Sequence, residues 1–404
     1  MRPMRALVLG AGYRGRAYSE YAAAHPEELE IVGVADPLQA GTIPAPRYWK
    51  DWRDCLSERP DADIAMITMP DDLHYEPALM ALEAGYHLLL EKPISQTEAQ
   101  CREVIARACE LGRLVIVGHV LRYTRYFAHI KAIVDSGEIG DVVTVNHQES
   151  AGFWKIAHAY VRGIFSIAEK ASPIILAKCS HDFDLFAWWL GRRCLKVSSF
   201  GSIKLFRPEN APDGSAARCA DCPESVRRHC IWDAHKMYLE FDDLRYLFAD
   251  SSYAAMRRLI RESPYGRCVY RCDNDVPDHQ TVIMEFDGGA TVTHTMTGFT
   301  GRNVRTTRIS GTRGEIVGNG DVIDVRRFDG GELETGVPPA YRVQNGSRHG
   351  GGDFNLVAEM LRIMRRGDAD EIRRVTEEAL QSHVIAFAAE RSRLAGGQVV
   401  EIEY

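Results

Sequence analysis

Short apolar runs alternate with helical stretches along the first 120 residues. The runs end at glycine, proline or acidic residues, which are turn signals. Apolar runs of this length between turn signals are typical of buried parallel strands. We expect strands at 6–9, 31–35, 62–69, 87–90 and 114–117, with helices at 16–25, 76–84 and 98–111. This alternation predicts an α/β domain, a doubly wound parallel sheet with right-handed crossovers.

The residues that directly follow these strands are the first candidates for chemistry. Ligands of doubly wound sheets bind outside the carboxyl ends of the strands. The residues at those ends are Pro70, Asp71, Glu91, Lys92, Pro93 and His119. An ordinary loop between strand and helix would explain any one of them. As a set they predict a binding site along one edge of the sheet.

A glycine-rich turn with the pattern G-x-G-x-x-G occupies residues 10–15, between the first strand and the first helix. Gly10 permits a tight turn and Gly12 lets the backbone approach a pyrophosphate. Gly15 lets the helix pack closely against the strand, and the helix N-terminus faces the phosphate charge. In this position the pattern predicts a Rossmann domain that binds a dinucleotide.

An acidic residue, Asp36, ends the second strand about 20 residues after the glycines. Its carboxylate would accept hydrogen bonds from the adenosine ribose and would repel a 2′-phosphate, so we expect NAD rather than NADP. Tyr13 and Arg14 belong to the same predicted cofactor site. Arg14 and Arg16 lie close enough in the sequence to leave NADP open.

The pattern changes beyond Arg122 to longer runs that are rich in β-formers. Turns such as 287–289, Asp-Gly-Gly, connect successive runs as hairpins. The predicted strands are 142–149, 196–206, 280–286, 290–298 and 306–311. These runs predict an open, mostly antiparallel sheet within an α+β domain. We divide the chain into a cofactor-binding domain at 1–122 and a second domain for substrate binding and oligomerisation at 123–404.

Two polar segments of the second half hold candidate catalytic and substrate-binding residues. The first, 178–184, leads into an apolar stretch at 185–190 that we expect to be a buried helix. The second, upstream, mixes aromatic, basic and acidic side chains, as a sugar site would, although one helix with a mixed face would look the same. The candidates are Glu149, Trp154, His158, Tyr160, Arg162, Lys178, His181 and Asp182.

Three cysteines at Cys219, Cys222 and Cys230 form the pattern C-x₂-C-x₇-C within a loop-like region. Three thiolates in one loop suit a structural zinc, which takes four nitrogen or sulfur ligands in tetrahedral geometry. Cys268 is the predicted fourth ligand. The other choices are Cys272, His229, His235 and Cys194. Three free buried thiols are the alternative.

Charge and hydropathy exclude several classes of protein. The chain has 404 residues and a formal net charge of −7, which argues against a nucleic-acid or membrane-surface binder, because both need a basic face. No apolar run is long enough for a membrane-spanning helix. The N-terminal residues lack the apolar core of a signal peptide. We therefore expect a cytoplasmic protein whose ten cysteines form no disulfide framework.

Glu91-Lys92-Pro93 at the end of a Rossmann strand resembles the corresponding motif of the Gfo/Idh/MocA oxidoreductases, which act mostly on sugars, inositols and related polyols. The resemblance extends over much of the chain. It includes the glycine turn, Thr68-Met69-Pro70-Asp71 with His74, Arg122-Tyr123, 131–140, His181-Asp182-Phe183-Asp184, 311–315 and the C-terminal helices. It implies NAD as cofactor, Arg122 and Tyr123 near the substrate, and homo-oligomers formed through the C-terminal sheet.

The resemblance also implies catalytic roles. Lys92 would contact the substrate hydroxyl and the nicotinamide ribose, and His181 would act as acid and base. The family often has Asp four residues before this His, and Ala177 stands there instead, next to Lys178. The usual Lys/Asp/His trio is thus incomplete. A glycine-rich loop around His349 resembles that of the family's NAD-dependent glycosidases.

These features predict an NAD-dependent oxidoreductase that transfers a hydride between the cofactor and a hydroxyl-bearing carbon of a sugar or sugar derivative. The alternative is a redox-neutral NAD-dependent glycosidase, which oxidises C3 transiently, eliminates the aglycone, adds water and returns the hydride. A cofactor-binding sensor without turnover is a third class, against which Lys92 and His181 count. Bulk formation of NADH would distinguish the first two.

Overall fold

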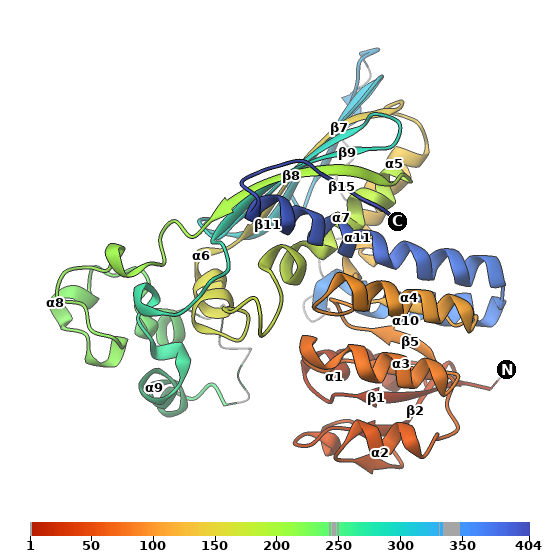
Figure 1. Ribbon diagram of the computed structural model, residues 1–404, viewed down its shortest axis with the longest axis horizontal. Helices are drawn as coiled ribbons and strands as arrows, with labels where there is room; N and C mark the ends of the chain where they lie inside the picture. Colours follow the sequence, from red (N-terminus) through yellow and green to blue (C-terminus); the bar gives the residue numbers. More distant parts are fainter. Residues whose placement is uncertain (1, 242–243, 245–247, 249, 331, 334–347) are drawn as a thin grey trace.

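The computed structural model describes residues 2–241, 244, 248, 250–330, 332–333 and 348–404. Two β-sheets organise the chain, one formed by the N-terminal residues and one by the remainder (Figure 1). The long helix α11, Ala369–Leu394, packs on α4 and β6 of the first part and on α7 and β8 of the second. In the part of the chain that the structure describes, no helix is long and apolar enough to cross a membrane.

The first sheet is parallel and has the strand order β3-β2-β1-β4-β5-β6. Its strands are β1 Met4–Leu9, β2 Leu29–Ala35, β3 Tyr48–Trp49, β4 Ile64–Ile67, β5 His87–Leu90 and β6 Val115–Val117. Every residue of β4 is buried, as expected for a strand covered on both faces. The predicted doubly wound sheet is confirmed, with β3 as a short addition at its edge.

Helices cover both faces of this sheet. They are α1 Tyr13–Ala24, α2 Trp52–Ser57, α3 Tyr75–Glu83 and α4 Glu98–Glu110. The side chain of Thr97 caps α4 by accepting a hydrogen bond from the backbone N–H of Gln100. A further helix, α10 Gly352–Arg366, comes from the C-terminal part and buries Leu356, Val357 and Met360 against Tyr18 and the strands. The sequence did not predict that this late segment completes the core of the first sheet.

The second sheet has nine strands in the order β14-β13-β12-β11-β7-β10-β9-β8-β15. They are β7 Val142–Ala151, β8 Cys194–Ser202, β9 His279–Phe286, β10 Thr291–Thr297, β11 Asn303–Gly311, β12 Gly314–Gly318, β13 Ile323–Arg327, β14 Glu332–Leu333 and β15 Val400–Glu401. All neighbours are antiparallel except β7 and β10. Buried residues alternate along β10, so one face packs and the other is open. The predicted open, mostly antiparallel sheet is confirmed.

Helices α5 Arg125–Asp135, α7 Ile174–Leu190 and α11 pack beside the second sheet (Figure 1). Helix α7 begins after Pro173, well before the segment 178–184 that we expected to lead into it. The early start has a physical reason, because 174–177 is an apolar run that is buried in the core. His181 and Asp184 therefore lie inside the helix rather than at its N-terminus.

A cysteine-containing segment, 203–278, extends from the second sheet (Figure 1). It contains two α-helices, α8 Glu224–Arg227 and α9 Tyr253–Glu262, within its described residues. Shorter turns of the chain that the site uses are η2 Asp71–Leu73, η3 Val120–Tyr123, α6 Phe153–Lys155, the π-helix Ile156–Arg162 and η12 Arg348–Gly351. The cysteine-containing segment packs on the π-helix Ile156–Arg162, next to the region where the two sheets meet.

Candidate active site at the meeting of the two sheets

The glycine turn has the geometry of a phosphate cradle. Gly10 has φ +103°, and a Cβ there would lie 2.8 Å from the backbone of Thr68. A Cβ on Gly15 would lie 2.1 Å from the carbonyl oxygen of Gly10. A Cβ on Gly12 would project into open space at the start of α1. The turn thus leaves room for a pyrophosphate at a helix N-terminus, and the residues fit the dinucleotide that the motif predicts.

Asp36 lies at the carboxyl end of β2 and binds the glycine turn. Its carboxylate accepts hydrogen bonds from the backbone N–H of Ala11 at 2.8 Å, Leu38 at 2.8 Å and Gln39 at 2.6 Å. These contacts hold the carboxylate beside the cradle, where the adenosine ribose of a bound dinucleotide would lie.

A network that the sequence did not predict joins the glycine turn to Glu91 and to helix α10. Arg14 donates to Glu91 at 2.6 Å, to Asp353 at 2.7 Å and to the hydroxyl of Tyr18 at 2.6 Å. Burial alone would raise the pKa of Glu91, but the charges of Arg14 and Lys92 lower it. Glu91 is thus ionised, and Arg14 is turned toward this network.

The loops after β4 and β5 are tied together by His74. Its Nδ1 lies 2.6 Å from the carbonyl oxygen of Pro93, and its Nε2 lies 2.8 Å from that of Met69. Asp71 follows Pro70 in η2, and its buried Oδ2 has no hydrogen-bond partner among the described residues. Burial raises the pKa of Asp71.

Lys92 connects the two halves of the molecule. Its Nζ donates a hydrogen bond of 2.7 Å to the carbonyl oxygen of Ala177 on α7. The family's usual Asp is absent at position 177, and the backbone carbonyl of Ala177 accepts the hydrogen bond from Lys92 instead. His181 lies one helical turn further along α7. The E-K-P loop of the first domain and α7 of the second therefore meet at this hydrogen bond.

The imidazole of His181 is held neutral. Burial lowers its pKa well below the ordinary value, and the charges of Lys92 and His119 lower it further. Its Nδ1 is buried and has no hydrogen-bond partner in the described part of the chain. The rings of His181 and His119 lie 5.8 Å apart. A neutral imidazole beside an ammonium group is suited to accept a proton.

His119 and Arg122 are both bound to Asp184. His119 Nδ1 lies 3.3 Å from the carboxylate, and Arg122 Nε donates to it at 2.8 Å. The paired charges lower the pKa of Asp184 against the effect of burial. Arg122 and Tyr123 line a cavity of about 730 Å³ between η3, the end of α7, α10 and α11. Neither Lys92 nor His181 lines this cavity.

A buried ionic network underlies the site. Glu149 on β7 forms ion pairs with Lys178 and, at 2.9 Å, with Arg305 of β11. Arg305 Nε also donates to Asp182 on α7 at 2.5 Å. His147 Nε2 lies 3.0 Å from the same carboxylate. Asp182 and Glu149, which we predicted to bind substrate, are thus already compensated by protein cations.

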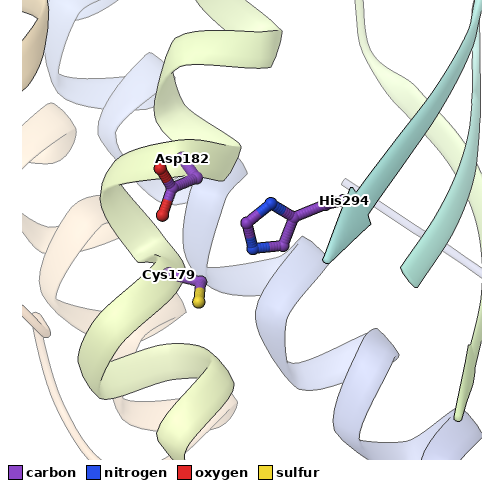
Figure 2. A group of neighbouring side chains, drawn as sticks. All are labelled: Cys179, Asp182 and His294. Atoms are coloured by element: carbon purple, nitrogen blue, oxygen red, sulfur yellow. The ribbon is translucent and has the colours of Figure 1, made fainter. Parts of the chain in front are cut away.

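Cys179, Asp182 and His294 form a fully buried group, with Cys179 and Asp182 on α7 and His294 on β10 (Figure 2). One ligand atom from each lies within 4.8 Å of the others, so the group has the donors and spacing for a metal ion. Burial raises the pKa of the Cys179 thiol, and Asp182 is engaged by Arg305 and His147. The raised pKa of Cys179 favours a neutral thiol, and the neighbouring Asp182 carboxylate is already paired with Arg305.

Two predicted substrate residues instead pack against the cysteine-containing segment. His158 stacks on Tyr265 with ring centroids 4.6 Å apart, and burial lowers its pKa to about 4. Arg162 donates to the carbonyl oxygens of Arg267 and Trp232, each at 2.7 Å. Both side chains lie on the π-helix Ile156–Arg162 and are buried against this segment.

Tyr160 and Trp154 remain close to the site. Tyr160 is buried, which raises its pKa well above the ordinary value, and Glu149 and Asp71 contribute to the shift. A phenol with a raised pKa is a proton donor rather than a base. Trp154 is half-buried on α6. His349 lies in η12, but its side chain is outside the described part of the structure.

Cys219, Cys222, Cys230 and Cys268 line one small cavity of about 20 Å³ together with Arg227 and Asp233. Burial raises the pKa of the Cys219 and Cys230 thiols. Arg162 Nη2 lies 3.6 Å from the Cys219 sulfur. The four predicted ligands therefore surround one space, although they come from separate turns of the segment.

The first part of the chain is a parallel sheet with a phosphate cradle, and the second part is an open sheet. Lys92 and His181 lie where the two parts meet. This arrangement is that of a two-domain protein that binds a dinucleotide. Residues 4–119 match the NAD-binding Rossmann fold of the Gfo/Idh/MocA oxidoreductase family, and residues 131–393 match its C-terminal alpha/beta domain. The chain belongs to this family. The predicted membership is confirmed.

Three similar proteins illustrate the relationship. YteT of Bacillus subtilis (strain 168) is 23% identical over 385 residues, which are 88% of each chain. The 2,7-anhydro-N-acetylneuraminate hydratase of Mediterraneibacter gnavus is 30% identical over 146 residues, 35% of this chain and 38% of that protein. The solved structure of levoglucosan dehydrogenase with NADH and levoglucosan is 18% identical, covers all of both chains and has a TM-score of 0.73.

Several residues of the site were missed from the sequence. Arg305 and Lys155 lie on a strand and a turn far apart in the chain, and no local motif marks them. The signal for Arg305 was weak but present, because an arginine at an inward-facing position of an amphipathic strand needs a buried partner. Lys155 directly follows Trp154, which we had singled out.

Proposed function

We propose that the protein is an NAD-dependent oxidoreductase that transfers a hydride between the nicotinamide and a hydroxyl-bearing carbon of a sugar or sugar derivative. The observation that carries the proposal is the hydrogen bond from Lys92 to the carbonyl oxygen of Ala177. It brings a cation of the cofactor domain beside the neutral His181 of the second domain. We assign 1–122 to cofactor binding and 123–404 to substrate binding and assembly.

The roles of the two residues follow from their charge. Bound NAD would supply the hydride acceptor. Lys92 stabilises the alkoxide that forms at the substrate oxygen, because its positive charge lies beside that oxygen. His181 accepts the hydroxyl proton, since its neutral imidazole has a free nitrogen electron pair. The remaining cofactor contacts that we propose are those of Gly10, Gly12, Gly15, Tyr13, Asp36 and the loops at Pro70 and Asp71.

Incubation with NAD and a panel of sugars and glycosides tests the proposal. NADH absorbance and the sugar products are followed together. We expect NADH and an oxidised sugar in equal amounts for at least one class of sugar. Stable NAD binding with no cofactor reduction and no product across the panel would contradict it.

A redox-neutral reaction is the second candidate. The Ala177 substitution removes the usual partner of Lys92 and His181, and the partial similarity to an anhydro-sugar hydratase favours this reading. Oxidation at C3 would acidify the C2 proton, elimination would follow, and the hydride would return after addition of water. Product formation with only transient NADH identifies this course.

We further propose a structural zinc held by Cys219, Cys222, Cys230 and Cys268. Support comes from the single cavity that the four cysteines line. All ten cysteines are free thiols in the structure, which suits the reducing cytoplasm in which we place the protein. Zinc analysis of protein purified without added metal tests this proposal. We expect about one equivalent, lost in Cys222→Ser and kept in Cys109→Ser, whose thiol lies on α4.

We also propose a homo-oligomer formed through the open face of the second sheet. Ile283 on β9 and Phe200 on the neighbouring β8 are 53% and 61% exposed on this face. Large apolar side chains gathered on an open sheet favour burial against another surface.

A further inference from the structure

The region around Glu149 contains more positive charges than this one carboxylate can neutralise. Lys178 and Arg305 are both ion-paired with Glu149. Lys92 reaches the same region through its hydrogen bond to Ala177, the residue before Lys178. Lys155 is the fourth cation of this group, which we call the lysine cluster: Lys92, Lys155, Lys178 and Arg305.

Lys155 follows strand β7 and lies close enough to the other cations of the cluster and to Glu149 to interact with them electrostatically. Strand β7 ends at Ala151, two residues beyond Glu149, and Gly152 with φ +67° turns the chain into α6. A residue with a side chain would be strained at that φ. Lys155 is the last residue of α6 and is half-buried.

Lys155 differs from the other three cations because it has no partner. Within the described residues its Nζ makes no hydrogen bond and no ion pair, while the others are each bound to a carboxylate or a carbonyl oxygen. The charges of Lys178, and then burial, lower the pKa of Lys155 to about 7. The ammonium form of Lys155 therefore lacks a neighbouring negative charge that would compensate it fully.

The nearby carboxylates supply only part of that charge, because Glu149 raises the pKa of Lys155 by less than Lys178 and burial lower it. Glu149 is shared by Lys178 and Arg305, and Asp182 is shared by Arg305 and His147. Burial raises the pKa of Asp71, which also interacts with Lys92 of the cluster, and this favours the neutral form of Asp71. A partly desolvated cation without a counter-charge is costly. A ligand anion would remove this cost.

We propose that Lys155 forms a subsite for an anionic group of the substrate, so that the enzyme acts on an acidic sugar carrying a carboxylate or a phosphate. The inference rests on the proposed function, since it concerns the substrate of that same site. Trp154 lies directly before Lys155 and would contact the apolar face of the sugar ring while the lysine binds its anion.

Matched substrates test the subsite. The full-length protein with saturating NAD is given glucose, galactose, their uronic acids and glucose 6-phosphate, and kcat/KM is measured from NADH formation. We expect at least one acidic sugar to exceed its neutral counterpart by about 10- to 100-fold, the range for a hydrogen bond to a charged group. The uronic acids and the phosphate distinguish the two kinds of anion.

Variants of Lys155 identify the residue responsible. Lys155→Met should raise KM for the acidic sugar and remove its advantage, and Lys155→Arg should restore most of it because the charge returns. Lys204→Met is the matched control, since Lys204 is exposed and lies beyond β8. An equal fall of kcat for acidic and neutral sugars in Lys155→Met would overturn the proposal, and so would equal kcat/KM for both in the wild type.

A binding experiment separates this proposal from the proposed function. Titration of the NAD-loaded protein with glucuronate, galacturonate and glucose 6-phosphate is followed by calorimetry. If no sugar reduces NAD but one of these anions binds and Lys155→Met weakens it about 10-fold or more, the oxidoreductase proposal fails and the subsite stands. If none binds, or if the variant binds as tightly as the wild type, the subsite is refuted.

Discussion

In the proposed reaction Lys92 and His181 act as a pair, because the charge of Lys92 favours the neutral form of His181. The ammonium of Lys92 lowers the pKa of His181 beyond the effect of burial, so the imidazole stays neutral when the cation is present. The carbonyl oxygen of Ala177 orients the lysine. The backbone of Ala177 is therefore sufficient to hold Lys92 beside the neutral His181, without a carboxylate at position 177.

Removal of either side chain should lower turnover strongly. Lys92→Ala loses the charge that stabilises the alkoxide, and His181→Ala loses the proton acceptor, so each should reduce kcat by about 10²–10⁴-fold. NAD affinity should change little, because the adenosine end is held at the glycine turn and Asp36. Single-turnover kinetics together with calorimetric NAD binding measure both. Wild-type turnover in His181→Ala would show that His181 is not the proton acceptor.

The sequence predicted some residues of the site and not others. Lys92 lies in a three-residue motif at a strand end, so its position could be read locally. The partners of Arg305 come from β7 and α7, more than 120 residues away in the chain, and only the folded register brings them together. Arg162 was predicted to contact substrate because the residues around it in the sequence are polar. Its guanidinium instead donates hydrogen bonds to backbone carbonyl oxygens of a loop that is distant in the sequence.

Strand β7, strand β11 and helix α7 are joined by one guanidinium. Arg305 pairs with Glu149 on β7 and with Asp182 on α7. Both carboxylates are about 1% exposed or less, so neither can be hydrated if the arginine is lost. The three elements that carry the proposed substrate side of the site therefore depend on this contact.

Arg305→Met should destabilise the protein severely. It leaves two buried carboxylates without their common cation, and breaking a buried ion pair costs about 3–5 kcal/mol. Arg308→Met is the matched control, because Arg308 lies on the same strand, is exposed and pairs with Glu315. Its loss should cost less than about 1 kcal/mol. Urea unfolding of both variants measures the difference, and equal stabilities would show that the network has no such role.

The element boundaries show where sequence patterns were sufficient. The parallel strands were predicted within a few residues, because they are continuous apolar runs between turn signals. The start of α7 was not, since 174–177 is apolar without helical periodicity and its polar continuation looked like a loop. The role of α10 was missed because its partner, the first sheet, lies over 200 residues earlier.

The whole molecule carries several histidines that are buried without charge. Burial lowers the pKa of His158 and His294 to about 4 and that of His383 to about 3. In the unfolded chain histidine titrates near pH 6.5. Between about pH 6.5 and 4 the unfolded chain therefore binds more protons, and the free energy of unfolding falls as the pH falls.

Each such histidine should cost about 1.4 kcal/mol of stability per pH unit across that window. Urea unfolding between about pH 7 and 5 measures the slope. His383→Gln should reduce the slope by about one histidine, because the imidazole of His383 is fully buried. A free energy of unfolding that is constant over this range would refute the prediction.

The proposed assembly through the open sheet concerns the whole molecule and can be tested on its exposed face. Ile283→Asp places a charge in the centre of the exposed face and should shift the protein toward the monomer by about 10-fold or more in dissociation constant. Ile231→Asp is the control, because Ile231 is equally exposed but lies in the cysteine-containing segment. Analytical ultracentrifugation compares them. The same distribution of species for both variants would place the interface elsewhere.

The proposed hydride transfer between a sugar carbon and NAD at the meeting of the two domains can be observed directly. The most direct measurement mixes NAD-loaded protein rapidly with a panel of neutral and acidic sugars and records NADH absorbance, with Lys92→Ala alongside. The account predicts NADH that accumulates in proportion to an oxidised sugar in the wild type and forms about 10²-fold or more slowly in Lys92→Ala. Sugar conversion without any NADH, transient or accumulated, or equal rates in the two proteins, would contradict it.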